Sequence, residues 1–172
     1  MLIVLFGYMA SGKTSIGMEL ADLLGFPFID LDQILESETQ ESIDQIFAKK
    51  GEVYFRKLEH QTLKHVLQQN EKGVLSLGGG TPCFSNNLEL LLNRHDVKTV
   101  FLKASVQTLT ERLFQDRSHR PLLSHIETKE ELSEYIGKHL FERTQYYNQA
   151  DLVLDANRSE QEILESLLFM LF

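Results

Sequence analysis

The residues best suited to chemistry lie near the start of the chain, in the segment GYMASGKT at positions 7–14. Their spacing fulfils the phosphate-binding pattern G-x-x-x-x-G-K-[ST], which is met by Gly7, Gly12, Lys13 and Thr14. The glycines let backbone N–H groups surround an anion, and the helix expected next adds its positive dipole end. Lys13 can then reach the β- and γ-phosphates, while the Thr14 hydroxyl can ligate Mg²⁺. Ala10 stands where many such loops have a further glycine, and its methyl group should be tolerated if that residue has a negative φ.

Two aspartates follow the second apolar run, in the segment FIDLDQILE. Residues two apart in a strand point to the same face, so Asp30 and Asp32 are expected to border the phosphate loop together. Asp30 could orient magnesium through its water shell, and Asp32 could face an acceptor hydroxyl. The alternative is that both aspartates only cap the next helix.

A run of three glycines, Gly78, Gly79 and Gly80, follows the third apolar run, VLSL. Successive glycines expose backbone N–H groups and admit a ligand against the main chain, although a plain flexible turn is the alternative. No aspartate ends this run, so the carboxylate that orders magnesium there in many phosphate-loop ATPases is missing. Asp30 is the substitute candidate.

Two arginines, Arg56 and Arg143, lie in expected helices, where a solvated charge is the ordinary role. If both side chains point into one cleft, they form a clamp for a carboxylate, because guanidinium groups bind planar anions bidentately. The acceptor of the phosphate would then be a small hydroxy acid.

Short apolar runs alternate with longer polar-patterned segments, which predicts an α/β fold with a parallel sheet wrapped by helices. The strands are expected at 2–6, 26–29, 74–77, 97–102 and 151–154. Helices are expected at 13–24, 32–39, 42–70, 86–93, 105–115, 128–148 and 159–171, with Gly51 dividing the third. No linker or repeat divides residues 1–172, so we expect one domain. The segment 115–125, QDRSHRPLLSH, has no clear periodicity and is interpreted as a mobile surface loop.

The composition bounds the function further. With 42% hydrophobic and 24% charged residues the chain has the make-up of a soluble globular protein, and a net charge of −8 argues against general nucleic-acid binding. The single cysteine, Cys83, forms no internal disulfide, which favours a reducing, cytoplasmic setting. No window reaches the roughly 18 apolar residues of a membrane span. The apolar C-terminal segment is interpreted as a core-facing helix, and we expect a monomer because no exposed apolar stripe requires a partner.

Taken together, six ordered motifs resemble the shikimate kinase family along nearly the whole chain. They are GYMASGKTSIG, FIDLDQILE, IDQIFAKKGEVYFRKLE, SLGGGTP, RPLL and ERTQYY followed by AD. The resemblance implies a three-layer α/β/α fold like that of nucleoside monophosphate kinases. It further implies a five-stranded parallel sheet in the order 2-3-1-4-5, a substrate-binding helical segment at about 32–60 and a lid at about 113–125.

The resemblance also implies roles for individual residues. Shikimate would be bound by Asp32, Arg56, Arg143 and the glycines Gly78, Gly79 and Gly80. The ATP phosphates would be wrapped by Ala10, Ser11, Gly12, Lys13, Thr14 and Ser15, with Thr14 on Mg²⁺ and Arg120 closing from the lid. Glu59 is expected to orient Arg56 from one helical turn away. For adenine, Arg112 or Arg117 could stack on the base, and Arg158 lies where the family's loop after the last strand meets it; the lid histidines His119 and His125 have no assigned role.

The implied reaction is transfer of the γ-phosphate of ATP to the 3-hydroxyl of shikimate, a step in aromatic amino acid biosynthesis. Lys13, Arg120 and Mg²⁺ would neutralise charge, and Asp32 would orient the hydroxyl and accept its proton. Two alternatives stay open: a kinase of the same fold with gluconate or a nucleotide as acceptor, and a non-catalytic nucleotide-dependent switch.

Overall fold

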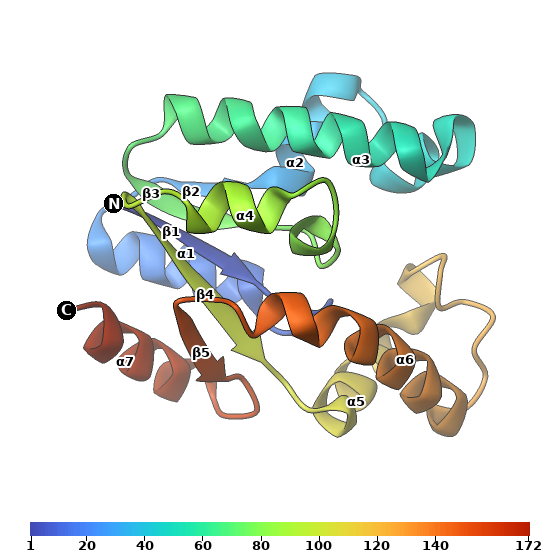
Figure 1. Ribbon diagram of the computed structural model, residues 1–172. Coiled ribbons are helices and arrows are strands. Elements are labelled where there is room, and N and C mark those ends of the chain that lie inside the picture. Colours follow the sequence, from blue (N-terminus) through green and yellow to red (C-terminus); the bar gives the residue numbers. More distant parts are fainter.

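The computed structural model describes residues 1–172 and contains one five-stranded sheet (Figure 1). The strands are β1 (Leu2–Phe6), β2 (Phe28–Asp30), β3 (Gly73–Ser76), β4 (Val97–Lys103) and β5 (Leu152–Asp155). They pair in parallel in the order β2-β3-β1-β4-β5. This confirms the predicted sheet and its strand order.

Seven α-helices connect or follow the strands. They are α1 (Lys13–Leu24), α2 (Leu31–Thr39), α3 (Ile43–Gln69), α4 (Asn87–Leu92), α5 (Val106–Asp116), α6 (Lys129–Tyr147) and α7 (Glu160–Leu171). Gly51 interrupts α3 with φ 82° and ψ 172°, so the predicted division of this segment is confirmed. The helices begin and end within two residues of the predicted bounds.

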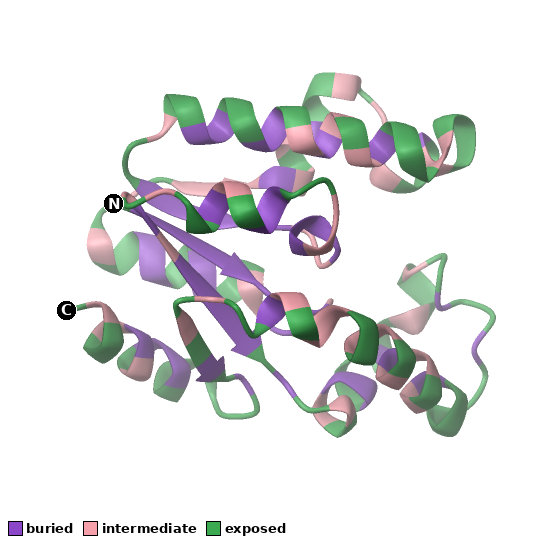
Figure 2. Ribbon diagram, viewed as in Figure 1, coloured by how far each residue is buried: buried purple, intermediate pink, exposed green.

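The core divides into two clusters because successive residues of β1 point to opposite faces of the sheet. Ile3 and Leu5 pack with residues of α1, α5 and α7, whereas Leu2, Val4 and Phe6 pack with residues of α2, α3 and α4. All five side chains are fully buried. Helices therefore cover both faces of a buried sheet, in three layers (Figures 1 and 2).

The strand order brings three functional segments to one edge of the sheet. β3 lies between β1 and β2, with Ser76 in register with Leu5 on one side and Asp30 on the other. The phosphate loop, the start of α2 and the glycine run leave these three strands at their carboxyl ends. In open parallel sheets, ligands bind at this edge.

The segment 115–125 is largely exposed, as predicted for a surface loop, but it contains short ordered elements. α5 continues to Asp116, a short 3₁₀ turn spans Arg117–His119, and the Leu123 side chain is fully buried in the core. Arg117 ties the segment down by donating hydrogen bonds to the carbonyls of Phe114 and Ile126 at 2.6 and 3.2 Å. The sequence did not show these features because a single 3₁₀ turn and one buried leucine are too short to create periodicity.

The C-terminal helix α7 buries Ile163, Leu164 and Leu167, as predicted for a core-facing helix. No helix in the protein combines the length and apolar character needed to cross a membrane.

Candidate active site

The phosphate loop connects β1 to α1 with glycines where the backbone requires them. Gly12 caps α1 with φ 96°, and a Cβ on Gly7 would lie 2.7 Å from the Leu102 carbonyl oxygen. The first N–H groups of α1 have no partner within the helix and are available to an anion. The Lys13 ammonium folds over the loop and donates to the carbonyls of Gly7 and Tyr8, each at 2.9 Å.

Ala10 adopts a left-handed conformation. Its φ is +62°, so the condition under which its methyl group would be tolerated without strain is not met. The loop keeps the curvature that a glycine would allow, and hydrogen bonds hold it: the Ser11 N–H donates to Tyr8, and Arg112 donates to the Ala10 carbonyl at 3.1 Å. A left-handed alanine costs about 1 kcal/mol, so these contacts offset local strain.

The two aspartates are not side by side on a strand. Asp30 ends β2 and caps α2, where its Oδ1 accepts from the N–H groups of Asp32 and Gln33 at 3.0 and 3.2 Å. Asp32 lies in the first turn of α2, so the predicted strand spacing was wrong, and the capping alternative holds for Asp30. The chain turns into the helix one residue earlier than the strand pattern indicated.

Asp32 still faces the phosphate loop and the glycine run. A Cβ on Gly78 would lie 3.0 Å from Asp32 Oδ1, so this glycine leaves room for the carboxylate. Burial raises the pKa of Asp32 to about 6, with Asp30 and Glu59 acting in the same direction and Lys13 opposing them. The group is ionised at neutral pH but able to take up a proton.

Lys13 is the cationic counterpart of Asp32. Burial lowers the pKa of Lys13 to about 8, while the negative charges of Asp32 and Asp30 raise it and the positive charges of Arg120 and Arg143 lower it. The Lys13 ammonium group therefore interacts electrostatically with charged residues of both the acceptor side and the lid.

Both predicted clamp arginines converge on the glycine run. A Cβ on Gly80 would lie 2.6 Å from Arg56 Nη2, and one on Gly79 would lie 3.4 Å from Arg143 Nη1. The Gly79 position also borders the phosphate loop, at 3.4 Å from the Gly7 carbonyl oxygen. Arg56 on α3 and Arg143 on α6 therefore meet beside one backbone segment, each with its side chain partly buried.

Arg56 is held by a buried carboxylate. Its Nη1 donates to Glu59 Oε1 at 2.9 Å, and Glu59, which is 1% exposed, accepts from the Thr81 hydroxyl at 2.7 Å. The Arg56–Glu59 contact confirms the predicted orientation from one helical turn away. Thr81 joins the glycine run to this pair, a link that the sequence did not indicate.

Tyr147 is a supporting residue that sequence reasoning missed. Its side chain is fully buried, and its hydroxyl donates to the Gly79 carbonyl. Tyr147 lies one helical turn after Arg143, so α6 contacts Gly79 through both residues. The signal available in the sequence was the spacing of four between Arg143 and Tyr147 in ERTQYY, which places both side chains on one face of a helix.

Arg120 lies on the lid segment, where its Nε pairs with Asp116 at 3.2 Å. The two side chains are 38% and 50% exposed, so this is a surface ion pair. His119 and His125 are exposed, and neither makes a side-chain hydrogen bond. Cys83 is partly buried, and burial raises the pKa of its thiol to about 11, in agreement with an unreactive side chain.

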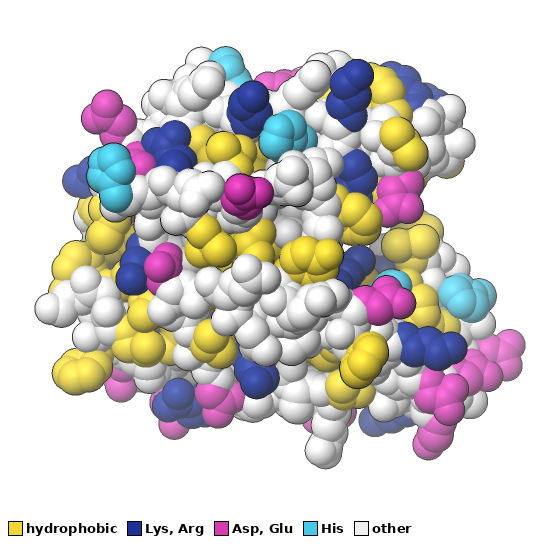
Figure 3. Space-filling model, in the orientation of Figure 1, with side chains coloured by type: hydrophobic (Ala, Val, Ile, Leu, Met, Phe, Trp, Pro, Cys, Tyr) yellow, Lys and Arg dark blue, Asp and Glu magenta, His cyan; other side chains and the backbone are white.

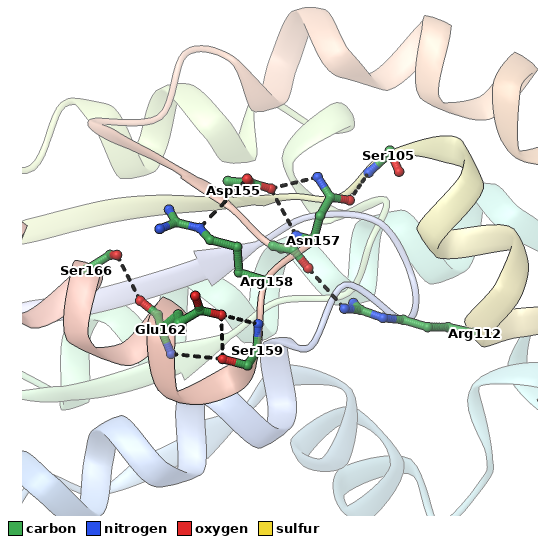
Figure 4. Close-up of polar contacts among 9 residues, drawn as sticks. Ser105, Arg112, Asp155, Asn157, Arg158, Ser159, Glu162 and Ser166 are labelled. Atoms are coloured by element: carbon green, nitrogen blue, oxygen red, sulfur yellow. Dashed lines mark hydrogen bonds and ion pairs between the residues drawn. The ribbon is translucent and has the colours of Figure 1, made fainter.

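The candidate adenine contacts separate in the structure. Arg112 bridges the phosphate loop and the loop after β5. It donates to the Ala10 carbonyl at 3.1 Å and to the Ala156 carbonyl at 3.0 Å, and Figure 4 shows the second of these contacts. Arg117 is instead occupied with carbonyls of the lid segment and lies over the Phe114 ring at 3.8 Å. Arg158 points away from Arg112, with its Nε 3.8 Å from Asp155 (Figure 4).

The chain contains no group of three or more His, Cys, Asp or Glu side chains placed to hold a metal ion. The Thr14 side chain is exposed at the start of α1, beside the free N–H groups. Such an arrangement fits Mg²⁺, which keeps several waters and takes substrate phosphates as ligands instead of using an all-protein cage.

The space-filling view shows a hollow between the far end of α3 and the lid segment, with Lys and Arg atoms at its walls (Figure 3). The strand order and the phosphate loop after β1 are those of a phosphate-loop kinase fold, and the cationic side chains at the glycine run suit an anionic acceptor. The family model described as "Shikimate kinase" matches residues 9–171. The chain therefore belongs to the shikimate kinase family.

Individual relatives of the chain are shikimate kinases as well. The chain is 46% identical over 170 residues to the shikimate kinase of Flavobacterium johnsoniae, covering 98% of each chain. The shikimate kinase of Flavobacterium psychrophilum is 42% identical over 172 residues, covering 99% of this chain and 98% of the relative. Among solved structures, the Bacteroides thetaiotaomicron shikimate kinase superposes with a TM-score of 0.90 at 33% identity, over 99% of this chain and 97% of the other. The Acinetobacter baumannii shikimate kinase in complex with shikimate superposes with a TM-score of 0.86 at 32% identity, over 99% of this chain and 92% of the other.

Proposed function

We propose that this chain transfers the γ-phosphate of ATP to the 3-hydroxyl of shikimate, giving shikimate 3-phosphate and ADP. The observation that carries the proposal is the meeting of Arg56 and Arg143 at the glycine run, beside Asp32 and Lys13. Membership of the shikimate kinase family supports it. A nucleotide-dependent switch would have no use for a clamp of this kind.

On the acceptor side, Arg56 and Arg143 bind the carboxylate of shikimate, because two guanidinium groups at one backbone segment match a planar anion. Gly78, Gly79 and Gly80 allow the ring to lie against the main chain. Asp32 accepts hydrogen bonds from shikimate hydroxyls, orients the attacking one and takes up its proton. The raised pKa of Asp32, about 6, suits this role, since a base works best with a pKa near the working pH.

On the donor side, the N–H groups of residues 10–15 surround the ATP phosphates. Lys13 exchanges its two carbonyl partners for phosphate oxygens. Arg120 leaves Asp116 and contacts the transferred phosphate when the lid, residues 113–125, closes and excludes water. Arg112 and Arg158 lie against adenine, with Arg112 favoured over Arg117 because Arg112 already borders the phosphate loop.

Mg²⁺ would neutralise charge on the β- and γ-phosphates during the transfer. Thr14 would hold the ion, and Asp30 would orient its water shell through the carboxylate oxygen that does not cap α2. We further expect the protein to be cytoplasmic and monomeric, and size-exclusion chromatography with light scattering tests the second expectation.

The decisive experiment is an ADP-release assay with MgATP and one acceptor at a time: shikimate, gluconate or a nucleoside monophosphate. We expect ADP release that depends on shikimate, with shikimate 3-phosphate as the product identified by NMR. Turnover with another acceptor in place of shikimate would assign the chain a different substrate. ATP hydrolysis that ignores all three would support a switch.

A further inference from the structure

Phe84 lies against the guanidinium group of Arg56. The Arg56 Cζ is 4.0 Å from the centre of the Phe84 ring, closer than it is to the rings of Phe55 at 5.2 Å and Phe47 at 5.8 Å. Cationic groups within about 6 Å of a ring face are attracted by its quadrupole. Phe84 therefore makes the closest of three aromatic contacts with this arginine.

Arg56 makes few polar contacts within the protein. Its guanidinium makes one hydrogen bond, from Nη1 to Glu59. Its Nε is buried without a hydrogen bond, 3.6 Å from the Glu52 carboxylate. One hydrogen bond and one longer ion contact define the guanidinium plane less strictly than a bidentate pair would, whereas bidentate binding of a carboxylate requires a defined plane.

A strained turn holds Phe84 in place. The next two residues, Ser85 and Asn86, have φ values of 55° and 56°, a left-handed conformation that is uncommon outside glycine. Such strain persists only where the surroundings enforce it. The Ser85 hydroxyl lies 3.5 Å from the Arg56 carbonyl, so the turn is tied to the residue that Phe84 contacts.

The far end of the turn is anchored in the core. Asn87 is fully buried, its Nδ2 donates to the Thr81 carbonyl at 2.9 Å, and His60 Nδ1 donates to its Oδ1 at 2.7 Å. Thr81 in turn contacts Glu59, the ion-pair partner of Arg56. The ring and the carboxylate that orient Arg56 thus belong to one connected group of side chains.

We propose that Phe84 is a positioning residue for acceptor binding: its ring, held by the Ser85–Asn86 turn, fixes the plane in which Arg56 meets the acceptor carboxylate. The inference rests on the proposed function for the identity of the acceptor. Phe84 acts through Arg56 and does not itself contact the reacting groups.

The first test compares Phe84→Leu with Phe84→Tyr in steady-state kinetics. Leucine keeps apolar bulk but removes the ring, so the KM for shikimate should rise about 3- to 30-fold, while kcat and the KM for ATP stay within about twofold. Tyrosine keeps the ring face and should retain a KM within about twofold of the parent protein. An unchanged KM for Phe84→Leu overturns the proposal.

The second test asks whether Phe84 acts through Arg56 or contacts the substrate directly. An acceptor analogue with a hydroxymethyl group in place of the carboxylate should give the same KM with Phe84→Leu and the parent protein. An equal loss with acid and analogue would mean that the ring touches the acceptor itself, which contradicts the proposal. Phe26→Leu is the matched control, because the Phe26 ring carries Lys72 at 4.3 Å but no residue of the site.

The third test does not depend on activity. In ¹H–¹⁵N spectra of the arginine side chains, the Arg56 Nε–H resonance should be shifted upfield by the ring and should move to the ordinary arginine range in Phe84→Leu. Arg56→Lys assigns the resonance. A resonance that stays in place overturns the inference, whereas absence of shikimate turnover in the parent protein overturns only the proposed function. If Phe84→Leu fails to fold, Phe84→Met provides the same comparison.

Discussion

Two arginines of the candidate site, Arg56 and Arg120, are held in opposite ways. Arg56 is 14% exposed and contacts a fully enclosed carboxylate, an aromatic ring and a glycine backbone. Arg120 is 38% exposed and has one ion pair, with the half-exposed Asp116. The acceptor side is therefore built in advance, whereas the lid arginine is held weakly enough to move.

The difference matches the two tasks that the proposed reaction requires. A fixed clamp lowers the cost of binding the acceptor, because little side-chain freedom is lost when the carboxylate arrives. A mobile arginine can enter after both substrates are bound and stabilise the charge of the transition state. Replacing each arginine should therefore disturb a different kinetic constant.

The largest effect is expected from Arg120→Ala. Removing an arginine that completes a phosphoryl-transfer site should lower kcat by about 10³-fold, with the KM for shikimate within about threefold. Steady-state kinetics at saturating ATP measures this. Arg94→Ala, which breaks a surface pair with Asp96 at 2.6 Å, is the control and should leave kcat unchanged. Unaltered turnover of Arg120→Ala would remove the lid role.

Arg56→Ala should instead change the KM for shikimate. Loss of charged hydrogen bonds to the acceptor carboxylate is worth about 1.5–3 kcal/mol, so the KM for shikimate should rise about 10- to 150-fold. The KM for ATP should stay within about twofold. Arg143→Ala is expected to behave alike. If either variant bound shikimate as before, the clamp would be the wrong interpretation of the two arginines.

Folding stability should separate the two arginines as well. Arg56→Ala leaves Glu59, 1% exposed, without its ion-pair partner, which should lower the free energy of unfolding by about 3 kcal/mol. Arg120→Ala breaks an exposed pair and should cost less than about 1 kcal/mol. Urea unfolding followed by circular dichroism measures both. Arg56→Met with Glu59→Leu should recover part of the loss; equal stability of the two single variants would contradict the contrast.

A pH profile tests the groups between the two arginines. Asp32 must be ionised to accept a proton, and burial raises its pKa to about 6, so kcat/KM for shikimate should fall about tenfold per pH unit below about pH 6. Lys13 must be protonated, so kcat/KM for ATP should fall above about pH 8. Phosphate binding stabilises the charged ammonium and should move the alkaline limb of kcat upward. A flat profile between pH 5 and pH 9 would exclude both roles.

The elements of the fold could be predicted because their signals are local. The alternation of apolar runs and amphipathic segments gave every strand and helix, and Gly51 marked the break in α3. Errors occurred where one residue decides the local backbone. Asp30 ends a strand and caps a helix at once, so its sequence spacing to Asp32 did not show where the strand stopped.

The site could be predicted in part for a related reason. Gly7, Lys13 and their neighbours form a contiguous motif, whereas the contacts of Glu59 with Thr81 and of Arg56 with Phe84 join segments more than twenty residues apart. No pattern within one segment reveals such contacts. The left-handed conformation of Ala10 could not be derived from the motif alone, and the Ala10 carbonyl accepts a hydrogen bond from Arg112, about a hundred residues away in the chain.

The smallest effect is expected from Asp116→Asn, which asks whether the weak hold on Arg120 matters. An exposed ion pair contributes about 0.2–1 kcal/mol, so freeing Arg120 should raise kcat/KM for ATP by no more than about fivefold. The direction follows from the lid: Arg120 must leave Asp116 to reach the phosphate, so removing the carboxylate lowers the cost of closure. Asp96→Asn, at the remote Arg94 pair, is the matched control. A decrease of tenfold or more would mean that Asp116 holds Arg120 in its working position, and the lid arginine would then be as fixed as Arg56.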